Sequence, residues 1–398
     1  MRALLLEQIH PDAETLLHLA GFSVETVARA LDEGELAASL AGVALLGVRS
    51  KTHVTERVLD AAPDLVAVGA FCIGTNQIDL QYASERGVTV FNAPFSNTRS
   101  VVELAIAEII AMTRRLTEKN DLMHRGVWDK SADGAHEVRG RTLGIVGYGN
   151  IGTQLSVLAE NLGMKVLFYD TADRLALGNA RRCVSMAELL AEADVVTLHV
   201  DGRASNKSLF GEAEFARMKH GALFLNLSRG FVVDYAALRD RVVSGAIAGA
   251  AVDVFPVEPR GRGDEFVSEL RGLDNVILTP HIGGSTEEAQ QDIGVFVAGK
   301  LRDFVREGSS SMSVNLPGLT LPRPLDTNRL IIIHRNVPGV MATINGVFAE
   351  HKANVEAQLL GTRGEFGYVV TDISANYTDE MLEQLETLPE TVRLRVVA

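Results

Sequence analysis

The chain has 398 residues, of which 46% are hydrophobic and 6% aromatic, and it contains 36 glycines. This length predicts two or three domains of ordinary size. Many glycines with few aromatic side chains favour an α/β protein with tight turns between strands and helices over an all-β sandwich. The formal net charge of −13 argues against binding to nucleic acid or to anionic lipid.

The chain has only two cysteines, Cys72 and Cys183, which are too few for a disulfide framework and lack a paired zinc-ligand spacing. We therefore expect no metal site and a reducing, cytoplasmic location. The N-terminal segment 1–7 reaches an acid too early for the apolar region of a signal peptide. The most apolar long stretch, 101–112, is interrupted by two glutamates, so we expect no membrane-spanning helix.

Short β-branched runs that alternate with helical patterns predict two successive series of βαβ units, each forming a parallel sheet. The first series has its expected strands at 3–6, 44–48, 65–70 and 88–91. The second has them at 142–146, 165–169, 195–199, 222–227, 249–254 and 276–279. Between the two series, apolar periodicity predicts one long helix from Ser100 to Arg125, which we expect to bridge domains or pair subunits.

A third module follows a helical stretch at 285–306 and two linker segments, 307–311 and 321–324, that are rich in serine or proline. Its expected elements are strands at 330–334, 355–361, 367–374 and 392–397 and helices at 338–351 and 378–388. This βαββαβ order is typical of a ferredoxin-like module. The predicted fold class is α/β, with two doubly wound, Rossmann-like parallel-sheet domains followed by the ferredoxin-like module. The expected domains are 1–97 together with 285–318, then 98–284, then 326–398.

A glycine-rich turn follows the expected strand at 142–146 and opens a helical pattern. Gly147 permits a tight turn, Gly149 lets the backbone approach a pyrophosphate, and Gly152 allows the helix to pack closely on the strand. Asp170 ends the next strand, where an acid accepts hydrogen bonds from a ribose 2′-hydroxyl and repels a 2′-phosphate. The pattern predicts an NAD site.

Two alternatives stay open at this strand end. The carboxylate of Asp170 could merely cap the turn that follows it, as aspartates often do. The guanidinium of the nearby Arg174 could accept a 2′-phosphate, which would admit NADP.

Three charged or titratable residues, Arg229, Glu258 and His281, follow three expected strands of the second sheet, at the edge where open α/β sheets bind their ligands. Oxidation of an alcohol to a ketone needs a base for the hydroxyl proton, a cation for the carboxylate and carbonyl, and an anion that orients the base. Each residue taken alone could be a surface arginine, a turn acid or a loop histidine. Their common placement at strand ends of one sheet favours an acid–base site.

The segments that carry these residues read Asn-Leu-Ser-Arg-Gly, Asp-Val-Phe-Pro-Val-Glu-Pro and Thr-Pro-His-Ile-Gly-Gly, and they resemble the signatures of the D-isomer-specific 2-hydroxyacid dehydrogenases. The resemblance implies that Arg229 binds the carboxylate and carbonyl of the substrate and that Glu258 and His281 form the acid–base relay. Formate dehydrogenase, a relative, has glutamine where Glu258 stands. The NAD contacts that the resemblance implies, beyond the glycine motif, are Asn150, Ile151, Asp170, Leu227, Ser228, Arg229, Asp253, His281, Ile282, Gly283 and Gly284.

Within that family, the segments 47–52, 69–76 and 92–100 resemble the phosphoglycerate dehydrogenase branch. This likeness implies oxidation of D-3-phosphoglycerate to 3-phosphohydroxypyruvate, the first step of L-serine biosynthesis. The substrate contacts that it implies are Arg49, Ser50, Lys51 and Asn97. Alternatively, the two cations of this set form an ordinary solvated strand end. 2-Oxoglutarate has a comparable shape, so a 2-hydroxyglutarate dehydrogenase, or one for another 2-hydroxy acid, is the alternative activity.

The C-terminal module resembles an ACT domain, a small unit that binds amino acids at subunit interfaces. The likeness implies that His334, Asn336 and Asn354 hold L-serine as a feedback inhibitor. Alternatively, the two asparagines only form turns. Arg335 stands where an acid is common in the family. Together with the long helix, the edge strands of this module favour a homo-oligomer, which we expect to be a tetramer.

Two functions of another class stay open. One is a non-catalytic scaffold that senses NAD, as in corepressors that share the dehydrogenase core. The other is an amino-acid-binding regulator in which the sheet domains only bind nucleotide.

Overall fold

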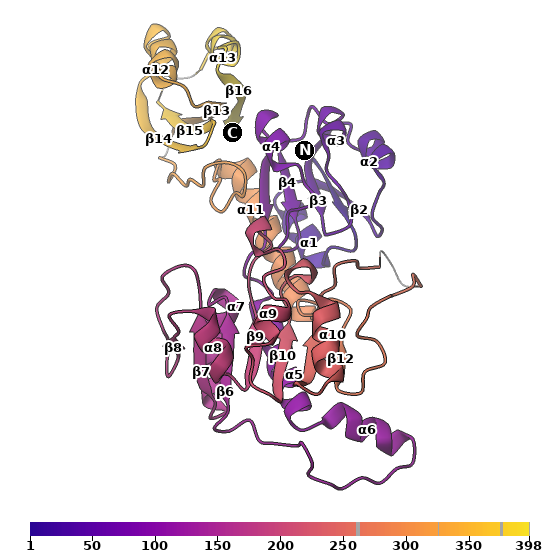
Figure 1. Ribbon diagram of the computed structural model, residues 1–398. Helices are drawn as coiled ribbons and strands as arrows, with labels where there is room; N and C mark the ends of the chain where they lie inside the picture. The colour runs from indigo at the N-terminus through magenta and orange to yellow at the C-terminus, as the bar shows by residue number, and fades with distance from the viewer. Residues whose placement is uncertain (260–262, 325, 375–376, 398) are drawn as a thin grey trace. The chain divides into compact units, whose positions relative to one another are not determined.

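The computed structural model describes residues 1–259, 263–324, 326–374 and 377–397 (Figure 1). Contacts group the chain into two compact units, Met1–Ser96 with Gln290–Ala398 and Asn97–Ala289. The division into three domains remains a prediction. Residues 375, 376 and 398 of its third domain lie outside the described residues.

A five-stranded parallel sheet forms the core of the N-terminal part of the first unit. In spatial order its strands are β2 (Ser23–Val27), β1 (Arg2–Leu6), β3 (Val43–Val48), β4 (Ala67–Ala70) and β5 (Thr89–Asn92). The connecting helices are α1 (Pro11–Leu19), α2 (Glu33–Ser39), α3 (Glu56–Asp60) and α4 (Leu80–Glu85). Strands β3, β4 and β5 are buried throughout, which explains why they were visible in the sequence as apolar runs.

A seven-stranded parallel sheet forms the core of the second unit. In spatial order its strands are β12 (Val276–Leu278), β11 (Ile247–Val252), β10 (Ala222–Asn226), β9 (Val195–Leu198), β6 (Thr142–Val146), β7 (Lys165–Tyr169) and β8 (Arg181–Arg182). The strand order reverses between β6 and β9, and ligands of open α/β sheets bind at such a reversal. The helices are α5 (Thr98–Thr113), α6 (Leu116–His124), α7 (Asn150–Asn161), α8 (Met186–Glu192), α9 (Glu212–Phe215) and α10 (Tyr235–Val243).

The prediction of one unbroken helix from Ser100 to Arg125 is wrong. The chain forms α5 and α6 instead, and Arg115 separates them with a left-handed φ of 52°. Figure 1 shows α6 standing away from the seven-stranded sheet of its unit. Hydrogen bonds from the Arg115 side chain to Glu118 and to the Asp133 carbonyl hold the break.

The C-terminal module has a four-stranded antiparallel sheet in the first unit. In spatial order its strands are β14 (Val355–Arg363), β15 (Phe366–Ile373), β13 (Asn328–Arg335) and β16 (Thr391–Val397). The helices of this region are α11 (Glu287–Glu307), which precedes the module, α12 (Val340–Glu350) and α13 (Asp379–Glu386). This is the order of a ferredoxin-like sheet, and the predicted fold class is confirmed.

The two faces of this sheet pack against different partners. Leu330 and Ile332 of β13 belong to one apolar cluster with residues of α12 and α13. Ile331 and Ile333, which point the other way, belong to a second cluster with Phe304 of α11. The module is thus bound to the helix that precedes it by a continuous core.

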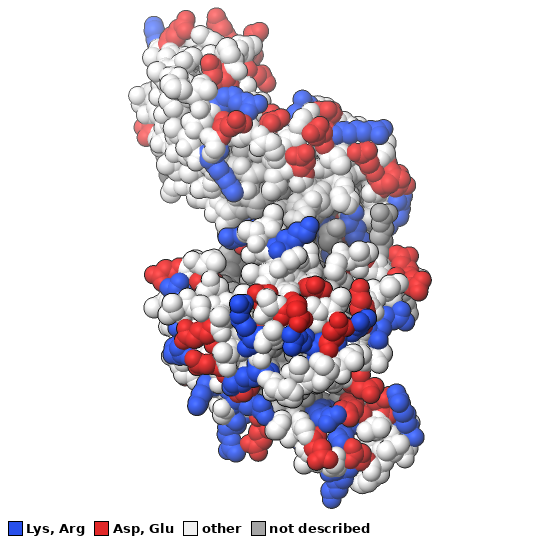
Figure 2. All heavy atoms as spheres, viewed as in Figure 1, with Lys and Arg blue, Asp and Glu red and all other residues white. Residues whose placement is uncertain are grey.

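Acidic and basic side chains are interspersed over the face shown in Figure 2, with both signs present on the surface of α6. No described helix combines the length and the apolar character that crossing a membrane requires.

Candidate active site

The glycine turn lies where β6 and β9 diverge. A Cβ on Gly147, whose φ is 94°, would lie 2.6 Å from the carbonyl oxygen of His199, so only glycine fits. A Cβ on Gly152 would lie 2.3 Å from the carbonyl oxygen of Gly147. Gly149, by contrast, faces open space and precedes α7, a helix that no described side chain caps at this end. The turn therefore leaves backbone N–H groups open to an anion such as a pyrophosphate.

Asp170 stands just after β7, beside the glycine turn. Its carboxylate accepts hydrogen bonds from the backbone N–H of Tyr148 and of Ala172, both at 2.8 Å. It thus caps the following turn and also supports the glycine turn. A carboxylate has about four acceptor positions, so two remain for ribose hydroxyls. The guanidinium of Arg174 lies 3.6 Å from the same carboxylate.

Arg229 follows β10 and is half-buried. The completely buried Asn226 holds this turn, because its amide donates to the Arg229 carbonyl and its Oδ1 accepts from Ser228. A Cβ on Gly230 would lie 2.0 Å from the carbonyl carbon of Phe255. The arginine turn and the segment that carries Glu258 are therefore close neighbours.

Glu258 and His281 form a hydrogen-bonded pair. His281 Nδ1 lies 2.9 Å from one carboxylate oxygen of Glu258 and 3.1 Å from the other. His281 has a φ of 56°, a left-handed conformation that is uncommon for a residue with a side chain. Such backbone strain is concentrated at functional sites.

The pair shifts the pKa of both partners. The hydrogen bond and charge of Glu258 raise the pKa of His281 above its ordinary value, although burial acts the other way. Burial alone would raise the pKa of Glu258, but the hydrogen bond and charge of His281 outweigh it, and the pKa is lowered. The positive charge of Arg229 lowers the pKa of both residues, so it opposes the shift of His281 and adds to that of Glu258. The pair thus favours the state in which the imidazole holds a second proton.

Asp253 anchors the turn that follows His281. Its buried carboxylate accepts hydrogen bonds from the N–H groups of Ile282 and Gly283, both at 2.8 Å, and from the hydroxyl of Thr279 at 2.6 Å. The structure therefore brings together Arg229, Glu258, His281 and Asp253 at the carboxyl edge of one sheet.

Asn97, expected to contact substrate, stands at the start of α5 beside this turn. A Cβ on Gly284 would lie 2.2 Å from its amide nitrogen, so any larger residue at 284 would displace the Asn97 side chain. Its Oδ1 is buried and makes no hydrogen bond within the described residues. A buried acceptor without a partner is costly unless a ligand satisfies it.

The other expected substrate residues, Arg49, Ser50 and Lys51, follow β3 in the first unit. Arg49 is partly exposed, and Ser50 and Lys51 are exposed. The side chain of Glu7 and the amide of Gln77 hydrogen-bond to the backbone of this turn.

The expected effector residues belong to the C-terminal module. His334 is completely buried at the end of β13, with its Nδ1 2.8 Å from the Arg335 carbonyl and its Nε2 without a partner within the described residues. The amide of Asn336 donates to the Gly364 carbonyl, and the amide of Asn354 donates to Glu356. The amides of both asparagines are thus bonded to groups of the module itself, and the assignment of these residues to L-serine remains a prediction.

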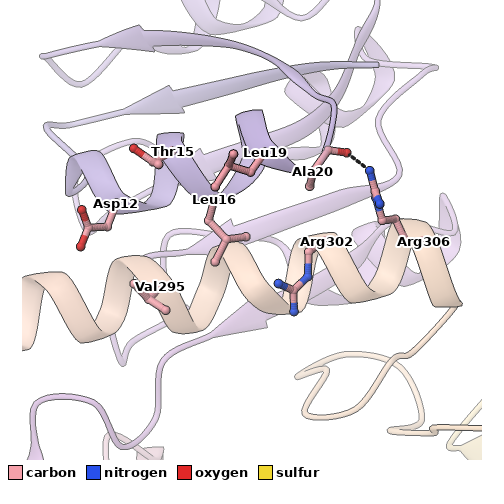
Figure 3. A pocket seen from close by; sticks show the side chains of 8 residues that line it. All are labelled: Asp12, Thr15, Leu16, Leu19, Ala20, Val295, Arg302 and Arg306. Atoms are coloured by element: carbon pink, nitrogen blue, oxygen red, sulfur yellow. Dashed lines mark hydrogen bonds between the residues drawn. The ribbon is translucent and has the colours of Figure 1, made fainter.

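A hollow of about 430 Å³ lies between α1 and α11 in the first unit (Figure 3). No expected site residue lines it. Arg306 donates to the Ala20 carbonyl, and Arg302 and Asp12 are bonded to Asp303 and Gln291. Its polar groups are therefore already paired with the chain itself. The lining residues are Asp12, Thr15, Leu16, Leu19, Ala20, Val295, Arg302 and Arg306.

Sequence reasoning missed the residues that hold the catalytic turns. Asn226, Tyr235 and Thr279 are such residues, since Tyr235 donates to the Val254 carbonyl and accepts from the Asn226 amide. The one sequence feature that could have indicated them is Asn226 itself, an amide side chain at the end of the apolar strand β10. Tyr235 and Thr279 bond to Val254 and Asp253, which follow another strand, and a linear pattern does not reveal such partners.

Comparisons with known proteins agree with this geometry. Residues 106–283 match the NAD binding domain of the D-isomer specific 2-hydroxyacid dehydrogenases, and residues 330–393 match the AHAS small subunit-like ACT domain. A D-3-phosphoglycerate dehydrogenase of Haemophilus influenzae is 49% identical over 398 residues, covering 100% of this chain and 97% of the relative. One from Dictyostelium discoideum is 46% identical over 397 residues, with the same coverage.

The chain belongs to the D-3-phosphoglycerate dehydrogenase family. Among solved structures, a D-lactate dehydrogenase from Aquifex aeolicus, complexed with NAD and lactic acid, is 28% identical with a TM-score of 0.70 and covers 79% of this chain and 100% of its own. The chain is accordingly an NAD-dependent dehydrogenase with a C-terminal ACT domain. The resemblance inferred from the sequence and the prediction of NAD are confirmed.

Proposed function

We propose that this enzyme oxidises D-3-phosphoglycerate to 3-phosphohydroxypyruvate with NAD, as the first step of L-serine biosynthesis. The observation that carries the chemistry is the hydrogen bond between Glu258 and His281 beside Arg229. The observation that carries the substrate is the likeness to D-3-phosphoglycerate dehydrogenases along the whole chain.

His281 acts as the general base. Its Nδ1 faces Glu258, so this nitrogen carries the ring proton and Nε2 is left to accept the proton of the substrate hydroxyl. Glu258 stabilises the imidazolium that forms, since it raises the pKa of His281. Arg229 offers a planar fork of donors to the substrate carboxylate and the developing carbonyl. NAD, when bound, would accept the hydride that leaves the substrate carbon bearing this hydroxyl.

The residues that would hold NAD fit it. The open N–H groups beside Gly149 suit the pyrophosphate, and the remaining acceptor positions of Asp170 suit ribose hydroxyls. The other contacts that we assign to NAD are Asn150, Ile151, Leu227, Ser228, Asp253 and the turn from His281 to Gly284.

Arg49, Ser50, Lys51 and Asn97 are the residues that we assign to the substrate. Two cations and a hydroxyl suit a phosphate, which carries more charge than the second carboxylate of 2-hydroxyglutarate. Purified enzyme should therefore form NADH faster from D-3-phosphoglycerate than from 2-hydroxyglutarate or glycerate, and faster with NAD than with NADP. A higher kcat/KM for 2-hydroxyglutarate than for D-3-phosphoglycerate would show that 2-hydroxyglutarate is the substrate. Binding of NAD without turnover of any of these acids would favour the non-catalytic scaffold that senses NAD.

L-Serine is the effector that we assign to the ACT domain. The support is His334, whose buried Nε2 has no partner within the described residues and can bond to a ligand. Serine at millimolar concentration should inhibit the parent enzyme, and His334→Ala should relieve inhibition without loss of basal turnover. Unchanged activity together with no serine binding by calorimetry would remove this assignment.

We assign the enzyme a homotetrameric assembly in the cytoplasm. Met123 and Trp128, in and after α6, are 52% and 78% exposed, and large apolar side chains that are this exposed can be covered at a protein interface. The edge strand β14 offers a second surface for pairing. Light scattering on the purified chain measures the assembly. Cys72 and Cys183 form no disulfide within the described residues, and such a state is compatible with a reducing compartment.

A further inference from the structure

Glu7 is a buried carboxylate of the first unit, and it holds a turn that we assign to the substrate. It follows β1, is 8% exposed, and its own N–H bonds to the Val27 carbonyl. Glu7 and Gln8 have φ values of 62° and 54°, two successive left-handed residues with side chains. Residues with side chains rarely adopt such a conformation, so the surrounding contacts must enforce it.

The carboxylate of Glu7 organises the turn formed by residues 49–52. Glu7 Oε1 accepts from the N–H of Arg49 at 3.1 Å and from that of Thr52 at 2.9 Å. Glu7 Oε2 accepts from the N–H of Lys51 at 3.0 Å. The amide of Gln77, itself 8% exposed, donates to the Arg49 carbonyl at 2.5 Å. Both ends of the turn are therefore tied to buried side chains.

Successive N–H groups that converge in a turn usually form a binding site for an external anion. In the turn 49–52 an internal anion, Glu7, takes three of the four N–H groups, and only that of Ser50 makes no hydrogen bond within the described residues. A substrate phosphate at this turn is then left with the Ser50 N–H and the side chains of Arg49, Ser50 and Lys51.

We propose that Glu7 is the positioning residue of the phosphate-binding turn, which it holds through three backbone N–H groups so that the side chains of residues 49–51 face the phosphate of the substrate. This inference rests on the proposed function, which assigns those side chains to D-3-phosphoglycerate. Glu7 itself touches no reacting atom. Its effect should appear in binding of the phosphorylated end and leave the chemical step nearly unchanged.

The test compares Glu7→Gln with the parent and with Glu25→Gln, an exposed glutamate of the neighbouring strand β2 that pairs with Arg2. The amide keeps the size of Glu7 but loses the charge and one acceptor oxygen. Hydrogen bonds to a charged group are stronger than those to a neutral group, so we expect KM for D-3-phosphoglycerate to rise about tenfold or more. The expected kcat changes by less than about threefold, kcat/KM for D-glycerate is retained, and NADH binding by fluorescence is unchanged.

Equal losses for D-3-phosphoglycerate and D-glycerate, or an unchanged KM, overturn the inference, because a general weakening of the fold or no role at all would produce them. If Glu7→Gln does not fold, Glu7→Asp and Gln77→Ala test the same inference by the same KM and kcat measurements. A parent enzyme that does not prefer D-3-phosphoglycerate to D-glycerate overturns the proposed function instead. The two failures are thus distinguishable in one set of assays.

Discussion

His281 Nδ1 and the carboxylate of Glu258 are 2.9 Å apart although 23 residues separate them in the chain. One nitrogen of the imidazole is thereby committed to an internal acceptor, and the other is left for a substrate proton. Because this bond raises the pKa of His281, it also decides at which pH the base is free to act.

Glu258→Gln should lower kcat about 10- to 100-fold, because an amide neither stabilises the imidazolium nor fixes the ring proton on Nδ1. Neutral His281 is the active form in oxidation, so activity rises with pH through its raised pKa. Without the carboxylate this pKa falls toward its ordinary value, and the acidic limb of the kcat/KM profile should move to lower pH. The pH profiles of kcat/KM are compared with those of the parent and of the control Glu269→Gln, in which the replaced glutamate is exposed. A limb that stays in place would show that another group titrates.

Asp170→Asn should weaken NADH binding about tenfold or more and reduce the preference for NAD over NADP. The variant keeps one acceptor oxygen, but it removes the charge that repels a 2′-phosphate and leaves Arg174 unopposed 3.6 Å away. Fluorescence titration with NADH and NADPH measures both effects. Asp173→Asn is the matched control, since that carboxylate is 97% exposed and pairs only with Arg182 within the described residues. An unchanged preference for NADH over NADPH would show that Asp170 only caps the turn that follows it.

The strands of the second sheet were predictable because buried parallel strands leave continuous apolar runs. All six expected strands of this series are present, with ends that differ by at most two residues. Strand β2 was not expected, since Ser23–Val27 lies at the edge of its sheet and carries an exposed glutamate. The helix break at Arg115 has no glycine or proline to indicate it, and hydrogen bonds of the Arg115 side chain to Glu118 and to the Asp133 carbonyl hold it.

The candidate site was predictable where its residues stand directly after a strand, because parallel strands bring their carboxyl ends to one edge. Arg229 and His281 are examples. The groups that position them were not predictable in the same way. Glu7 bonds to N–H groups 42 to 45 residues away, and Asn226 acts through a turn whose shape depends on Tyr235.

Glu108 should make stability fall as the pH rises. It is 3% exposed on α5, neither carboxyl oxygen has a partner within the described residues, and burial together with the charge of Asp253 raises its pKa to about 8. The folded chain therefore keeps a proton that the unfolded chain releases above its ordinary pKa of 4.5. The stability that depends on this proton is complete below pH 4.5, falls as the pH approaches 8 and changes no further above it.

Glu108→Gln removes this dependence, because the amide mimics the protonated acid. Between pH 5 and pH 8 the free energy of unfolding of the variant should improve relative to the parent by on the order of 3–5 kcal/mol. Urea unfolding at several pH values measures the difference. If the free energies of unfolding of the parent and the variant changed with pH in parallel, Glu108 would be ionised in the folded chain.

Arg329 and Asp372 should be worth far more to stability than a surface pair of the same geometry. They join β13 to β15 with two hydrogen bonds of 2.7 Å, and their side chains are 1% and 0% exposed. Arg329→Met should lower the free energy of unfolding by about 3–5 kcal/mol, because it leaves Asp372 buried and uncompensated. It also removes the hydrogen bond from Arg329 to the Glu307 carbonyl at the end of α11. Adding Asp372→Leu should recover most of the loss, since an apolar pair of similar volume needs no partner charge.

The control is Arg29→Met, which breaks an equally short bidentate pair with Glu35 whose side chains are 62% and 42% exposed. Solvent screens that pair, so its loss should change stability little. Urea unfolding of the single and double variants separates the effects. If Arg29→Met and Arg329→Met were equally harmful, or if the double variant were no better than Arg329→Met, burial of an unpaired carboxylate would not be the reason for the loss.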